Sequence, residues 1–161
     1  MGEQPAQRRP TVLVADDEPS IREVLADGLA REGYDVVTAA DGIEACEISE
    51  ACPPEVALLD LLLPRRDGYS VLLHLRSREA TRHSPVFFVS AEPPAEHAEI
   101  ARALGAQGFI AKPFRIAEVC AIVRSALRDR AIEAPRRPAG SSAEGAGPAA
   151  APAAPAGASP P

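Results

Sequence analysis

Five polar side chains stand directly after short apolar runs of the sequence: Asp16, Asp17, Asp60, Ser90 and Lys112. Carboxylates can hold a cation or attack an electrophile, a hydroxyl can donate a hydrogen bond, and an amine can bind an anion. Lys112 is the single lysine in a chain whose other 16 basic side chains are arginine. Each residue alone is ordinary, because aspartate and serine often cap helices and a lone lysine is often a solvated surface charge. Their joint placement is what indicates a site.

Three carboxylates in one place repel one another unless a cation joins them. Two unit charges about 4 Å apart repel by about 4 kcal/mol at an effective dielectric constant of 20. A set of oxygen ligands without Cys or His favours Mg²⁺, which keeps open positions suited to a phosphoryl oxygen. A carboxylate can attack phosphorus and form an acyl phosphate, whose oxygens a metal ion, an ammonium and a hydroxyl neutralise. The set therefore predicts Mg²⁺-dependent phosphoryl transfer to an aspartate.

The elements that must position these side chains alternate between short apolar runs and helical patterns. The expected strands are residues 11–15, 34–38, 56–59, 86–89 and 108–111. Three of the expected helices are residues 20–32, 95–104 and 115–130. Another begins at the capping sequence 41–44 and ends before Pro53. A further helix, which follows the strand 56–59, contains Val71, Leu72 and Leu75. Repeated strand–helix units predict an α/β fold with a parallel sheet covered on both faces. Because the carboxyl ends of parallel strands meet at one edge, the five polar side chains are expected to gather there.

The two ends of the chain differ in composition from the middle. Residues 134–161 contain Ala, Pro, Gly and Ser almost exclusively and no Leu, Ile, Val, Phe or Tyr. A segment with so little to bury cannot offset the entropy of ordering, so we expect a disordered tail over 132–161. Residues 1–10 contain two prolines and no apolar periodicity, which favours a flexible arm. The single folded domain is expected to span residues 11–131.

Charge and hydropathy exclude several classes of protein. The formal net charge of -6 argues against nucleic acid as the main partner, because binding a polyanion requires clustered cations. No apolar run approaches the roughly 20 residues that span a bilayer, so no membrane association is expected. Three cysteines without a Cys-x-x-Cys pair favour reduced thiols over a metal or redox site: Cys46, Cys52 and Cys120. These observations together predict a cytoplasmic protein.

Four segments of the chain carry a resemblance to a known family: VLVADDEP (12–19), LLDLLLPRRDG (58–68), VFFVSA (86–91) and GAQGFIAKPF (105–114). In this order they resemble the CheY-like receiver domain of bacterial two-component response regulators, and the resemblance covers about residues 10–131. Four ordered motifs within one strand–helix frame are far more specific than any single short motif. The resemblance implies a flavodoxin-like (βα)5 fold, a doubly wound sheet with the strand order 2-1-3-4-5.

The resemblance also implies a role for each acidic residue. Asp60 would be the phosphoacceptor, which takes a phosphoryl group from a sensor histidine kinase or a phosphotransfer protein. Mg²⁺ would be held by the carboxylates of Asp17 and Asp60 and by the backbone carbonyl of Leu62. Asp16 would orient the shell around the metal.

Three further residues take roles in the same way. Lys112 would bind the phosphoryl group, Ser90 would be the switch hydroxyl, and Phe109 would be the switch aromatic, where tyrosine is commoner. Pro93 and Pro94 restrict the loop that should move on activation. We expect a protein that signals by binding a downstream effector protein and that turns over no external substrate.

The family's DNA-binding members often dimerise through acidic residues just before the switch aromatic, and here those positions are Gln107 and Gly108. This departure, together with a tail that leads to no second domain, predicts a stand-alone receiver that does not itself bind DNA.

Two alternatives stay open at this stage. The first is a pseudo-receiver that serves as a scaffold without phosphorylation, which the restricted loop at Pro93 and Pro94 favours and the full set of site residues opposes. The second is an aspartate-nucleophile phosphohydrolase, which usually has a second acid two residues after the nucleophile, where this chain has Leu62. A flavodoxin that binds a flavin is excluded by the acidic sequence 16–19, which would repel a phosphate.

Overall fold

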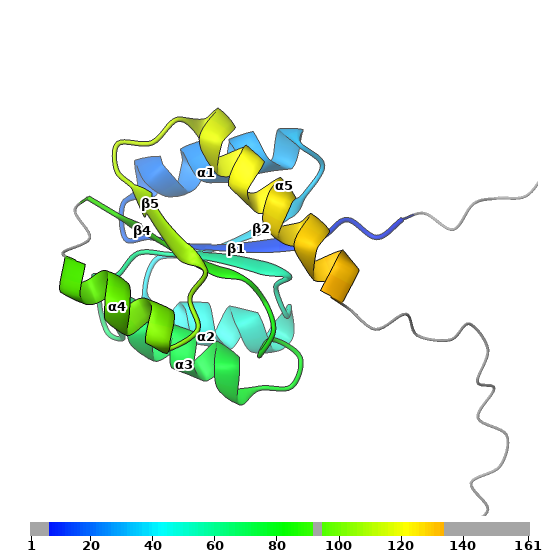
Figure 1. Ribbon diagram of the computed structural model, residues 1–161. Coiled ribbons are helices and arrows are strands. Elements are labelled where there is room, and N and C mark those ends of the chain that lie inside the picture. The colour runs from blue at the N-terminus through cyan, green and yellow to red at the C-terminus, as the bar shows by residue number, and fades with distance from the viewer. Residues whose placement is uncertain (1–6, 92–94, 134–161) are drawn as a thin grey trace, which may run out of the picture.

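In the described part of the chain, five strands form one parallel sheet in the order β2-β1-β3-β4-β5 (Figure 1). The computed structural model describes residues 7–91 and 95–133. The strands are β1 (Thr11–Ala15), β2 (Asp35–Ala39), β3 (Val56–Leu59), β4 (Val86–Ser90) and β5 (Gly108–Ala111). Their order and their positions along the chain confirm the predicted fold, with shifts of one residue in β2 and β4.

The two faces of the sheet are covered by five helices within residues 7–91 and 95–133. They are α1 (Pro19–Arg31), α2 (Gly42–Ala51), α3 (Gly68–Ser77), α4 (Ala95–Ala103) and α5 (Ile116–Glu133). Helices α1 and α5 lie on one face, and α2, α3 and α4 lie on the other (Figure 1). None of the helices in the described part of the chain combines the length and the hydropathy that a bilayer span requires.

The central strands are apolar on both faces because each face is covered. In β1, Val12 and Val14 belong to the buried cluster that includes residues of α1 and α5. Leu13 and Ala15, which point the other way, belong to the cluster that includes residues of α2 and α3. Alternate residues of a strand face opposite sides of a sheet, so a strand buried on both sides reads as a continuous apolar run.

The predicted start of α2 is confirmed in its capping contacts. Asp41 accepts hydrogen bonds from the backbone N–H groups of Ile43 and Glu44 at 2.8 and 2.9 Å. The Glu44 carboxylate in turn accepts a hydrogen bond from the backbone N–H of Ala40 at 2.7 Å. These bonds satisfy N–H groups that a helix start leaves without partners.

Helix α5 extends beyond the predicted end at Arg130 and reaches Glu133. The Arg130 guanidinium donates a hydrogen bond to the Glu55 carbonyl at 2.8 Å, which ties the last turns of α5 to the segment before β3. Residues 132 and 133, which the sequence assigned to the tail, are therefore helical. The rest of the predicted tail, most of the predicted N-terminal arm and the loop with Pro93 and Pro94 lie outside the described residues.

Candidate functional site

The register of the sheet brings the ends of four strands to one edge. Ala15 of β1 pairs with Leu59 of β3, so that the next residues, Asp16 and Asp60, lie level with each other. On the other side of β3, Ser90 pairs with Ala111, and Lys112 follows directly. The polar side chains that the sequence singled out therefore stand at the carboxyl edge of neighbouring strands, where ligands bind in open α/β sheets.

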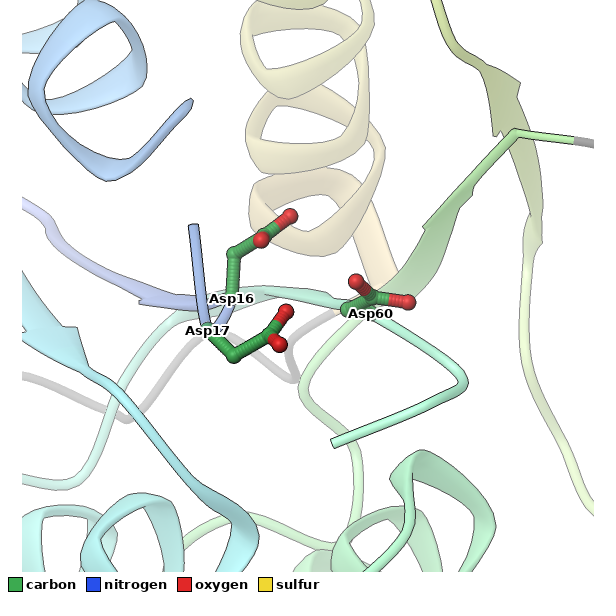
Figure 2. Close-up of side chains that lie close together, drawn as sticks. All are labelled: Asp16, Asp17 and Asp60. Carbon is green, nitrogen blue, oxygen red and sulfur yellow. The ribbon is translucent and has the colours of Figure 1, made fainter. Parts of the chain in front are cut away.

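The three aspartates form a compact cluster. One carboxylate oxygen from each of Asp16, Asp17 and Asp60 lies within 4.8 Å of the others, and Figure 2 shows the three side chains close together. Asp16 and Asp60 are 1% and 9% exposed, whereas Asp17 is exposed at the rim. Buried carboxylates at this spacing require a cationic partner.

Lys112 supplies one such partner. Its ammonium Nζ lies 2.6 Å from Oδ2 of Asp16 and 3.2 Å from Oδ2 of Asp60. Burial alone would lower the pKa of Lys112, but its hydrogen bonds and charge interactions with Asp16 and Asp60 outweigh burial and raise that pKa above its usual value. The side chain is thus a fixed positive charge that faces the acidic cluster from the end of β5. The Lys112–Pro113 peptide bond that follows it is cis.

The other contacts of the carboxylates distinguish their roles. Asp16 uses its second oxygen to accept a hydrogen bond from the Glu18 N–H at 2.9 Å, so both of its oxygens have partners. Oδ1 of Asp60 accepts a hydrogen bond from the Leu62 N–H at 3.0 Å. Within the described residues, Asp17 has neither a hydrogen bond nor an ion pair to its side chain. Asp17 is therefore the carboxylate most available to a ligand.

This donor set fits a magnesium ion. Among residues 7–91 and 95–133, one ammonium faces three carboxylates, so negative charge at the edge is left without a partner from this part of the chain. All available ligand atoms are oxygens, which suit Mg²⁺ better than softer metals. The carboxylates of Asp17 and Asp60 lie close enough together to hold such an ion.

The remaining predicted site residues lie in β4, in β5 and in the loop after β3. Ser90 is 9% exposed at the end of β4, and its carbonyl accepts a hydrogen bond from the Lys112 N–H at 2.8 Å. Phe109 is partly buried, and its ring centroid lies 5.5 Å from that of Phe88. The Leu62 side chain is 83% exposed beside Asp60.

Two supporting residues were not predicted from the sequence. The Arg22 guanidinium of α1 donates a hydrogen bond to the Asp16 carbonyl at 2.6 Å, which braces the loop after β1. Gly68 at the start of α3 lies so close to the loop after β3 that a Cβ atom there would be 2.3 Å from the Asp60 carbonyl oxygen. Gly68 follows Asp67 in a loop of turn-forming residues, but nothing local in the sequence indicates the contact of Arg22.

Comparison with known proteins identifies the family. The family model described as the response regulator receiver domain matches residues 12–124. The alkaline phosphatase synthesis transcriptional regulatory protein PhoP of Bacillus subtilis is 39% identical over 124 residues, which is 77% of this chain and 51% of PhoP. The transcriptional regulatory protein PdtaR of Mycobacterium tuberculosis is 37% identical over 117 residues, which is 72% of this chain and 56% of PdtaR. The chain thus spans about half the length of these relatives.

Comparison with solved structures leads to the same family. The chemotaxis protein CheY4 of Vibrio cholerae matches with a TM-score of 0.71 and 28% identity, over 74% of this chain and 99% of CheY4. The receiver domain of the sensor histidine kinase PA1611 of Pseudomonas aeruginosa, solved with a magnesium ion coordinated in its active-site cleft, matches with a TM-score of 0.68 and 30% identity, over 75% of this chain and 99% of that domain. With its flavodoxin-like sheet and its acidic cluster at the carboxyl edge, the chain belongs to the family of response regulator receiver domains.

Proposed function

We propose that Asp60 is the phosphoacceptor of this receiver domain. The observation that carries the proposal is the position of its carboxylate, which lies in the acidic cluster and 3.2 Å from the Lys112 ammonium. An oxygen of Asp60 attacks the phosphorus of the donor, the bond between phosphorus and the donor breaks, and an acyl phosphate forms. The donor is the phosphohistidine of a sensor histidine kinase or of a phosphotransfer protein.

Each neighbour of Asp60 has a distinct task in this step. Lys112 binds an oxygen of the incoming phosphoryl group, and Ser90 donates a hydrogen bond to another. Asp17, Asp60 and the Leu62 carbonyl would hold a magnesium ion, which would supply further positive charge to the transferring group. Asp16, whose oxygens are already bound to Lys112 and to the Glu18 N–H, orients these groups.

Movements of Ser90 and Phe109 transmit phosphorylation of Asp60 to the surface of the domain. A phosphoryl group on Asp60 attracts the Ser90 hydroxyl, which moves the end of β4. Phe109 then turns further inward, and the surface around α4 and α5 is reshaped for a downstream effector protein. The domain carries out one transfer and one hydrolysis on itself and acts on no external substrate.

Phosphorylation is tested by the mass of the intact protein. With Mg²⁺ and a small phosphodonor, the full chain should gain about 80 Da, which is the mass of one phosphoryl group. The Asp60→Asn variant should show no gain, because an amide cannot form the acyl phosphate. Omission of Mg²⁺ should slow the gain strongly. A wild-type protein that gains no mass with any donor would contradict the proposal and support a phosphorylation-independent scaffold.

The domain is proposed to act in the cytoplasm by binding another protein, and not to bind DNA itself. The proposal rests on Gln107 and Gly108, which occupy positions before Phe109 that are acidic in many DNA-binding members. The phosphorylated full chain should not shift a mixed pool of genomic DNA fragments. A phosphorylated chain that binds the DNA would contradict this part of the proposal.

Leu62 is proposed to shield the acyl phosphate from water. Its side chain is apolar, 83% exposed and two residues after Asp60. Leu62→Asn should shorten the lifetime of the phosphorylated protein several-fold, because a polar side chain admits and orients an attacking water molecule. The loss of the phosphoryl group is followed by intact mass after removal of the donor. Leu73→Asn, at a half-exposed leucine of α3, is the matched control and should leave the lifetime unchanged. Equal lifetimes for the wild type and Leu62→Asn would refute the proposed shielding.

A further inference from the structure

Helix α4 is attached to the rest of the domain by few contacts. Its single buried residue is Ala101, and an alanine side chain removes little apolar surface from water. Within the described residues, the only side-chain hydrogen bonds between α4 and another element join His97 to Tyr69 of α3. An element with so little burial is expected to open at a lower free energy than the core around it.

The contact between Tyr69 and His97 is close and directional. The Tyr69 hydroxyl lies 2.8 Å from Nδ1 of His97 and 3.2 Å from the His97 carbonyl oxygen, and the two rings stack with centroids 5.8 Å apart. A hydroxyl has one proton, so both hydrogen bonds form together only if Nδ1–H of His97 donates to the Tyr69 oxygen and the Tyr69 O–H donates to the carbonyl. Burial raises the pKa of Tyr69, and the charge of Asp67 adds to this, so the hydroxyl keeps its proton.

Tyr69 is itself held against the acidic site. The residue before it, Gly68, donates its N–H to the Leu61 carbonyl at 3.0 Å and lies in close contact with the Asp60 carbonyl. The Tyr69 ring meets the ring of Phe88 edge-on with centroids 5.3 Å apart, and Phe88 is completely buried. Tyr69 therefore cannot shift without disturbing either the loop that carries Asp60 or the core of the sheet.

We propose that the contact between Tyr69 and His97 is a clamp that couples the position of α4 to the state of the acidic site. This inference rests on the proposed function. Ser90 ends β4 and Ala95 begins α4, so a movement of Ser90 toward a phosphoryl group on Asp60 displaces the first turn of α4, which carries His97. Tyr69 stays fixed, and the movement therefore strains the clamp. Coupling between two sites is reciprocal: if phosphorylation weakens the contact between Tyr69 and His97, that contact must make phosphorylation less favourable by the same free energy.

The test compares the full-length wild type with Tyr69→Phe and His97→Leu. Tyr69→Phe keeps the ring and removes only the hydroxyl, so the fold is preserved, and thermal denaturation verifies this. Hydrogen exchange of the α4 amides should become about fivefold faster in both variants, with exchange of the α5 amides unchanged. The reason is that the loss of one neutral hydrogen bond raises the equilibrium constant for opening of the helix by a few-fold.

Beryllofluoride with Mg²⁺, which mimics a phosphoryl group on an aspartate, should bind to both variants about fivefold more tightly than to the wild type. Tyr34→Phe removes the other tyrosine hydroxyl of the chain, on the opposite face of the sheet, and should change neither quantity.

Three results would overturn the clamp. The first is α4 exchange in Tyr69→Phe equal to that of the wild type. The second is faster α4 exchange with unchanged beryllofluoride affinity, which would make the contact purely structural. The third is a double variant whose effects equal the sum of the two single effects, because partners in one contact should not be additive. Failure of the wild type to bind beryllofluoride would instead contradict the phosphoacceptor role, and the α4 exchange rates would still decide whether Tyr69 and His97 hold the helix.

Discussion

Lys112→Ala is expected to lower the rate of phosphorylation of Asp60 by about 10²- to 10³-fold, the usual cost of removing one preorganised donor from a developing negative charge. The Lys112 ammonium lies 2.6 and 3.2 Å from carboxylate oxygens of Asp16 and Asp60, and it is the only Lys or Arg side chain in the described residues that forms an ion pair with either of them. Without it, the incoming phosphoryl group meets carboxylates that have lost their protein cation. The rate is measured by intact mass against time with Mg²⁺ and a small phosphodonor.

Two variants separate the role of the Lys112 ammonium from that of positive charge in general. Lys112→Arg keeps the charge but replaces a compact ammonium by a planar, bulkier group, so it should recover only part of the rate. Arg124→Ala removes an exposed cation of α5 that pairs with Glu32 at the end of α1 and lies outside the acidic cluster, so it should leave the rate unchanged. A Lys112→Ala protein that is phosphorylated as fast as the wild type would exclude the proposed role of Lys112.

Asp17→Asn is expected to weaken Mg²⁺ binding by more than tenfold and to stabilise the metal-free protein. Asp17 is exposed and has no side-chain partner within the described residues, so its charge is available to a metal ion. In the absence of metal, the same charge repels Asp16 and Asp60, and its removal should raise the free energy of unfolding by up to about 1 kcal/mol, the scale of an interaction with an exposed charge. Affinity is measured by calorimetric titration and stability by denaturation without Mg²⁺.

The control for this charge removal is Asp27→Asn, which removes an exposed carboxylate of α1 outside the acidic cluster. It should change neither the Mg²⁺ affinity nor the stability to a comparable extent. Equal affinities for the wild type and Asp17→Asn would show that Asp17 is not a ligand. A loss of affinity accompanied by a loss of stability would show that the substitution acts by disturbing the fold.

The sequence predicted the strands and the approach of the acidic residues because both depend on local pattern and on one rule of topology. Runs such as 56–59 are buried on both faces, which is typical of a parallel sheet with a helical layer on each face. Once the strands are parallel, their carboxyl ends share an edge, so Asp16, Asp60 and Lys112 meet although up to 96 positions separate them in the chain.

The hydrogen-bond partners of individual helix side chains were beyond the reach of the same reasoning. The hydrogen bond between Tyr69 and His97 spans 28 positions and depends on how α3 and α4 are placed against each other, which apolar periodicity does not encode. The hydrogen bond from Arg22 to the Asp16 carbonyl was also not predictable, because the sequence does not indicate which carbonyl an arginine on a helix contacts. The end of α5 was missed because the contact that holds it, from Arg130 to Glu55, joins residues 75 positions apart.

The most direct test of the central claim is to locate the phosphoryl group on the chain. The phosphorylated protein is reduced with borohydride, which converts an acyl phosphate into an alcohol, and is then digested and sequenced by mass spectrometry. The account predicts the reduced side chain at position 60 and unmodified carboxylates at Asp16 and Asp17. Modification at either of those aspartates, or a phosphoryl group on a serine or histidine with Asp60 unmodified, would contradict it.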